Sequence, residues 1–224
     1  MKIVFNIDDL AMVNTDGIID EKIIDKLCRL LSNLTNSGVH TILVTAGAIL
    51  LGWQKLRKTD APDNIPDKQA AAAIGQTELM SIYQNAFDEY NKVVAQVLVT
   101  RDVITNEKMQ YNANNTLDKL LELDIIPIIN ENDSVTTLDI EAEDNYPLAA
   151  SVATVAQADL VIVILDIDKE FLWVENNKTF GNKIESREAL YEKINEYKSE
   201  LDIHPLNVGN FSFPQNFPEY IEIE

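Results

Sequence analysis

Polar residues follow several apolar runs of this sequence directly, at positions where they could bind a small charged ligand. The run at 3–5 leads into Asn6 and Asp8, and the run at 125–129 leads into Asn-Glu-Asn-Asp at 130–133. Carboxylates accept hydrogen bonds from ammonium groups, and amides both donate and accept. Four polar residues after one apolar run are more than a solvated turn requires. We therefore interpret residues 130–133, Asn132 and Asp133 above all, as part of a binding site.

Two further stretches offer complementary chemistry. The run at 41–45 leads into Ala46, Gly47 and Ala48, where a helical pattern begins. The free backbone N–H groups of a helix N-terminus bind anions such as a carboxylate or a phosphate. Asp144 and Asn145 precede a second helical pattern that starts near Pro147, so they could bind a ligand or merely cap that helix.

The elements that would position these residues alternate along the chain. Apolar runs without polar alternation indicate strands covered on both faces, and longer amphipathic stretches lie between them. We predict an α/β fold, a three-layer α/β/α sandwich with a mostly parallel central sheet. Ligands bind at the carboxyl ends of such strands. The predicted strands are 3–7, 41–45, 93–99, 125–129 and 160–165, and the predicted helices are 20–36, 46–58, 67–90, 107–123 and 147–157.

Length and composition indicate the number of domains and the classes of partner. A chain of 224 residues suits one α/β domain, which we place at 1–200, followed by an irregular tail at 201–224. The net charge of −19 makes nucleic acid and anionic membrane poor partners. The single cysteine, Cys28, can form no internal disulfide, and no stretch suggests a signal peptide or a membrane span. We expect a cytoplasmic protein.

The first strand alone also permits a different interpretation. Haloacid-dehalogenase phosphatases resemble it, but they require a nucleophilic aspartate where this chain has Asn6. Thr45 and the pair Asp166 and Asp168 could serve such an enzyme. That alternative leaves the Asn-Glu-Asn-Asp cluster at 130–133 unexplained.

The motifs together resemble those of the amino-acid kinase family, and among its members the glutamate 5-kinases. The resemblance rests on "VTAGAI", "KQAAAAIGQ", "VLVTR", "PIINENDSV", "EDN", "LAA" and "AQADLVIVILD", which keep their order from about residue 18 to residue 166. It implies ATP-dependent phosphorylation of the glutamate γ-carboxylate, a step of proline biosynthesis. It also implies that the glutamate lies against three groups of residues: Ala46 to Ala48, Asn132 with Asp133, and Asp144 with Asn145.

Other positions depart from the family pattern. Family members carry a lysine and then a glycine near the end of the first strand, where this chain has Asn6 and Asp8. A serine of the second turn is replaced by Ala46, and an acid after the Asp-Asn pair is replaced by Tyr146. No second phosphate-binding lysine is recognisable in "NVGNFSFPQNF". Lysines stabilise the transferring phosphoryl group, so we expect a shortened, degenerate nucleotide side that includes Asn6, Asp8 and Asp166.

These expectations combine into one hypothesis with two alternatives. The leading hypothesis is a protein that keeps an amino-acid pocket, has no catalytic or metal-ligating residue that we can assign, and transfers phosphate poorly. The first alternative is an active kinase that uses ATP, Mg²⁺ and substitute cations such as Lys169. The second is a scaffold or regulatory subunit of an active kinase. We also expect a homo-oligomer or a hetero-oligomer, with Ile82, Tyr83 and Phe87 of the helix at 67–90 offering apolar contact area.

Overall fold

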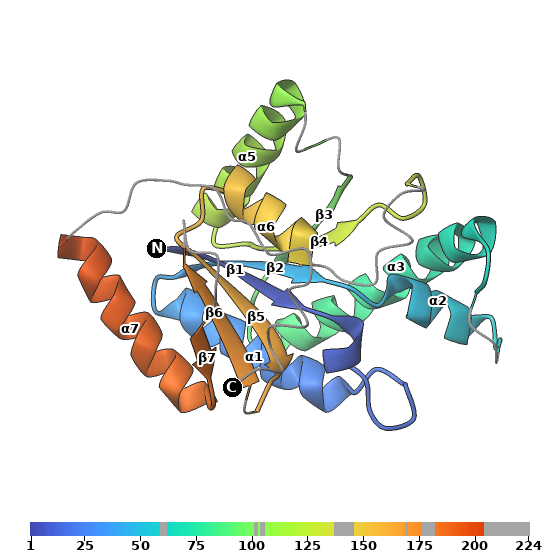
Figure 1. The fold of residues 1–224 in the computed structure, drawn as a ribbon, viewed down its shortest axis with the longest axis horizontal. Coiled ribbons are helices and arrows are strands. Elements are labelled where there is room, and N and C mark those ends of the chain that lie inside the picture. The colour runs from blue at the N-terminus through green and yellow to red at the C-terminus, as the bar shows by residue number, and fades with distance from the viewer. Residues whose placement is uncertain are drawn as a thin grey trace.

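A seven-stranded sheet forms the middle layer of the computed structural model (Figure 1). The structure describes residues 1–58, 62–100, 103, 106–136, 146–168, 170–175 and 182–203. The first five strands of the sheet order are parallel, and the last two pair antiparallel. In spatial order the strands are β3 (Val94–Val99), β4 (Ile126–Glu131), β2 (His40–Thr45), β1 (Lys2–Ile7), β5 (Leu160–Asp166), β6 (Glu170–Glu175) and β7 (Asn182–Ile184).

Helices cover both faces of the sheet, as the continuous apolar strands predicted (Figure 1). Helices α1 (Glu21–Asn36) and α3 (Ile65–Asp88) pack on one face, where Ile3 and Phe5 of β1 point. Helices α5 (Glu107–Glu122) and α6 (Tyr146–Val155) pack on the other face, where Val4 points. The predicted three-layer α/β/α fold is confirmed.

Two short helices follow strand ends on the carboxyl edge of the sheet. The 3-10 helix η1 (Asp9–Ala11) follows β1, and α2 (Ala48–Lys55) follows β2 and crosses α3. Both begin where the sequence placed candidate site residues. The carboxyl edge therefore carries two of the groups that were expected to bind a ligand, the segment around Asp8 and the turn from Ala46 to Ala48.

The strand and helix predictions up to residue 166 agree with the structure to within a few residues. The sequence did not reveal β6, β7 or α7 (Arg187–Ile203). Helix α7 continues three residues into the predicted tail, and residues 204–224 lie outside the described part. Among the described side chains of α7 only Leu190 and Ile194 are buried, which explains why its apolar period was weak.

The expected contact area on α3 is partly wrong. Tyr83 and Phe87 are fully buried, and their ring centroids lie 6.5 Å apart in the core between α3 and the sheet. They are therefore unavailable to a partner subunit. In the described part of the chain, no helix is both long enough and apolar enough to cross a membrane.

Candidate functional site

A cavity of about 410 Å³ opens at the carboxyl ends of β3 and β4, beside α3. Its wall combines the start of α2, one face of α3, the outer strand β3 and the turn after β4. The lining residues are Ala48, Ala72, Ala73, Gln76, Thr77, Met80, Gln96, Leu98, Glu131, Asn132, Asp133 and Ser134. Small-molecule sites commonly have volumes of roughly 300–1,000 Å³, so a metabolite fits here.

The turn before α2 requires glycine at position 47. Gly47 is the N-cap of α2 and has a left-handed φ of 95°. A Cβ at this position would lie 3.4 Å from Met12 Cε and 3.5 Å from Ile19 Cδ1. The turn therefore rests on the segment that follows β1, with Ala48 in the cavity wall.

A buried cluster of Thr45, Tyr83 and Met12 supports the same turn. The hydroxyl groups of Thr45 and Tyr83 are 2.8 Å apart, and the Tyr83 hydroxyl donates to Met12 Sδ at 3.2 Å. Burial raises the pKa of Tyr83 well above its ordinary value, so the hydroxyl stays protonated. The cluster links α3 to the last residue of β2, directly before the turn.

The turn after β4 is fixed by short-range hydrogen bonds. The Asn132 N–H donates to Val99 O at 2.8 Å, and the Val135 N–H donates to Asn132 O at 3.1 Å. The Ser134 hydroxyl donates to Asn132 Oδ1 at 2.6 Å. Asp133 lies within this ordered turn and in the cavity wall.

Two amide side chains connect β4 to α3 next to the cavity. Asn130 is almost fully buried and accepts the Glu131 N–H at 2.9 Å through Oδ1. Its Nδ2 donates to Gln76 Oε1 at 2.8 Å. Gln76 thus has a fixed place in the cavity wall.

The structure brings only some of the predicted site residues together. Ala48, Asn132 and Asp133 line the cavity. Ala46 and Gly47 lie in the turn beside Ala48 and do not line it themselves. Asp144 and Asn145, the third predicted group, lie outside the described residues.

Sequence reasoning missed the contribution of α3 and β3 to the cavity. Gln76, Thr77 and Met80 come from α3, and Gln96 and Leu98 come from β3. The motif "KQAAAAIGQ" ends at Gln76, but its residues had been assigned no role. A helical period would have placed Ala72, Gln76 and Met80 on one face of α3.

The predicted nucleotide side lies around β1 and β5, away from this cavity in the strand order. Asn6 is fully buried in β1 between Val44 and Val163, and neither atom of its amide has a hydrogen-bond partner. The Asp8 carboxylate accepts the Asp9 N–H at 3.1 Å, and Asp166 accepts the Asp168 N–H at 2.9 Å.

The residues of this predicted nucleotide side, Asn6, Asp8 and Asp166, are neutral or acidic. A neutral amide occupies the position on β1, and two carboxylates near it repel phosphate. Among the described residues, no three His, Cys, Asp or Glu side chains gather to hold a metal ion. Lys169, the suggested substitute cation, lies outside the described residues.

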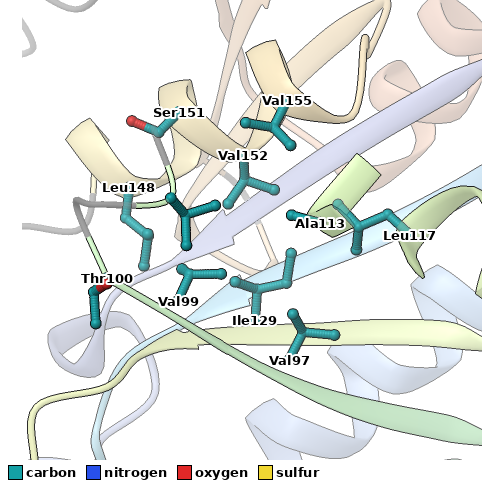
Figure 2. Close-up of a pocket in the computed structure, with 11 residues that line it drawn as sticks. Val97, Val99, Thr100, Ala113, Leu117, Ile129, Leu148, Ser151, Val152 and Val155 are labelled. Atoms are coloured by element: carbon teal, nitrogen blue, oxygen red, sulfur yellow. The ribbon is translucent and has the colours of Figure 1, made fainter. Parts of the chain in front are cut away.

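A second, smaller cavity lies between α5, α6 and the outer strands (Figure 2). Its volume is about 20 Å³, close to the space of one water molecule. Figure 2 shows mostly aliphatic side chains around it, among them Val99, Leu117 and Val152, with Thr100 and Ser151 as the polar exceptions. We assign it no chemistry.

Comparison with known proteins points to one family. Residues 11–171 match the model of the amino acid kinase family. The chain is 40% identical to a glutamate 5-kinase of Enterococcus faecalis over 204 residues, which cover 89% of this chain and 73% of that protein. It is 44% identical over 171 residues to glutamate 5-kinases of Caldanaerobacter subterraneus and Clostridium perfringens.

The chain spans less than two thirds of the length of two of these relatives. The 171 matched residues make up 76% and 75% of this chain, but 46% of the Caldanaerobacter protein and 64% of the Clostridium protein. Among solved structures, a carbamate kinase from Giardia lamblia bound to AMP-PNP is similar, with a TM-score of 0.50 and 13% identity. That match covers 75% of this chain and 74% of the other, and it supports the fold alone.

Proposed function

Because this chain belongs to the amino acid kinase family, we propose that it binds a small amino acid, glutamate first, in the cavity between α3, β3 and the turn after β4. The observation that carries the proposal is the pairing of opposite chemistries in one cavity wall. Ala48 contributes the N-terminus of α2, and Asp133 contributes a carboxylate. The printed names of the relatives, glutamate 5-kinase, support glutamate as the first ligand to test.

The two ends of an amino acid suit these two groups. The first N–H groups of a helix lack partners within the helix and attract a carboxylate. A carboxylate such as that of Asp133 attracts an α-ammonium group. Ala46 has no hydroxyl to offer in the same turn, so we expect modest affinity.

We also propose that the chain transfers phosphate from ATP poorly or not at all. Phosphoryl transfer depends on positioning and on cations near the developing negative charge. At the end of β1 the chain offers Asn6, an uncharged and fully buried amide, followed by Asp8. Loss of one such donor costs about 3 kcal/mol, or roughly a hundredfold in rate.

Self-association through the outer strand β3 is part of the proposal. Among the described residues, β3 pairs with β4 on one side only, and no described strand pairs with its other edge. Val93, directly before β3, and Leu98, within β3, are 62% and 38% exposed. A second copy of the chain, or a related active kinase, would cover these side chains next to the amino-acid cavity. Light scattering at micromolar concentration tests this, and a mass near that of one 25.2 kDa chain contradicts it.

The function is tested by two measurements on the purified chain. Thermal unfolding with and without glutamate reports binding, and ADP release with ATP, Mg²⁺ and glutamate reports transfer. We expect a higher melting temperature with glutamate and no glutamate-dependent ADP release. Release of ADP that stops in Asp133→Ala would establish a working kinase. No shift and no release would leave a purely structural subunit.

A further inference from the structure

The orientation of the Asn130 amide is fixed by the backbone beside it. The Glu131 N–H can only donate, so the atom that it meets at 2.9 Å must be the Asn130 oxygen. The nitrogen of Asn130 therefore faces Gln76, 2.8 Å from its nearest side-chain atom. Since Asn130 Nδ2 can only donate, that atom of Gln76 must be Oε1.

This series of hydrogen bonds leaves Gln76 Nε2 without an acceptor. Gln76 Nε2 carries two N–H groups, is buried, and has no hydrogen-bond partner. A buried donor without a partner costs about 1–3 kcal/mol. Gln76 is also part of the cavity wall, so a ligand can supply the missing acceptor.

We propose that Gln76 is a specificity-determining residue of the cavity, whose Nε2 donates a hydrogen bond to a carboxylate oxygen of the bound amino acid. This inference rests on the proposed function, because it concerns the same cavity. A carboxylate presents acceptors only and strengthens the bond by its charge. An ammonium group of a ligand at the same place would meet the donor with another donor, and an amide would offer only its uncharged oxygen.

Another glutamine on α3 shows the contrast. Gln69 Nε2 donates to Thr136 O at 3.0 Å, so its amide is already engaged with the protein. Gln96, on β3, lines the same cavity but is exposed to solvent. Among the glutamines of the described residues, Gln76 is the one whose Nε2 donor is both buried and without a partner.

Gln76→Glu is the sharpest variant. It keeps the size of the side chain and an oxygen for Asn130 Nδ2, and it replaces only the donor with a charged acceptor. Gln96→Glu is the matched control, because it adds the same charge to the same cavity at another point. Calorimetry with glutamate should show binding weakened by about tenfold to a hundredfold in Gln76→Glu, and by far less in Gln96→Glu.

A second measurement does not depend on that variant folding. In ¹⁵N-labelled wild type, the side-chain NH₂ signals of Gln76, assigned by their loss in Gln76→Met, should shift on adding glutamate. Equal weakening by both charged variants, or unmoved NH₂ signals while glutamate binds, overturns the role of Gln76 and leaves the proposed function standing. Absence of glutamate binding by wild type overturns both.

Discussion

Gly52 of α2 and Gly75 of α3 meet at a helix crossing that leaves no space for a side chain at either position. A Cβ on Gly52 would lie 1.8 Å from Ala71 O, and a Cβ on Gly75 would lie 1.7 Å from Ala48 O. The two backbones touch directly, as small residues permit. This crossing holds Ala48, the first residue of α2, against α3 and so sets the width of the cavity.

The helix crossing predicts that Gly75→Ala destabilises the protein. Alanine favours an isolated helix by about 1 kcal/mol over glycine. Here its methyl group would collide with a backbone carbonyl, which cannot rotate away, so we expect a net loss of about 3 kcal/mol or more. Urea unfolding followed by circular dichroism measures the difference.

Ala70→Gly is the control for that experiment. Ala70 is exposed on the same helix, so its replacement should cost only the helix propensity, about 1 kcal/mol. Gly75→Ala as stable as wild type would show that α2 and α3 do not pack this closely.

The unpartnered amide of Asn6 predicts a stabilising substitution. Asn6→Val replaces two buried polar atoms without partners by an apolar side chain that favours strands. We expect the free energy of unfolding to rise by about 1–3 kcal/mol, seen as a higher melting temperature. A drop in stability would mean that a bound group satisfies the amide in solution, as an active phosphate site would require.

The buried cluster under the Gly47 turn predicts a loss in Tyr83→Phe. Removing the hydroxyl deletes its contacts with Thr45 and Met12 and should cost about 1 kcal/mol of stability. Glutamate binding should weaken too, since Thr45 directly precedes the turn. Tyr111→Phe, at an exposed tyrosine of α5, should change neither quantity. An equal effect of both variants on stability and on glutamate binding would show that the buried cluster does not support the turn.

Cys28 offers a chemical probe of the same core. Its side chain is fully buried, and burial, with a further contribution from Asp25, raises the pKa of the thiol above its ordinary value. We expect no reaction with a thiol reagent at pH 8 in the native protein, and complete reaction in urea at the unfolding midpoint and above. Rapid labelling of the native chain would show that α1 opens far more readily than this packing allows.

The sequence allowed the centre of the fold to be predicted because the inner parallel strands β4, β2, β1 and β5 are buried on both faces. Ile3 and Phe5 pack in the core on one face of the sheet, and Val4 packs in the core on the other face. A strand buried in this way appears in the sequence as a short continuous apolar run. Among its described side chains, helix α7 buries only Leu190 and Ile194, so its pattern was weak. The turn residues Gly47 and Asp133 could be proposed as site residues because they follow apolar strand runs closely.

The rest of the site depends on contacts between elements far apart in sequence. Gln76 meets Asn130 across 54 positions, and neither residue type alone indicates that pairing. Likewise, the inward direction of Tyr83 depends on which face of α3 meets the sheet. Both faces of that helix carry apolar residues, so the period did not decide between core and surface.

The most direct test of the account is calorimetric titration of the purified chain with glutamate, wild type beside Asp133→Ala. We predict saturable binding by the wild type. In Asp133→Ala the loss of the ammonium partner should weaken it by roughly 2–3 kcal/mol, about thirty- to more than a hundredfold. No heat from the wild type with glutamate, aspartate or glutamine, or equal affinity of the two proteins, would contradict an amino-acid site in this cavity.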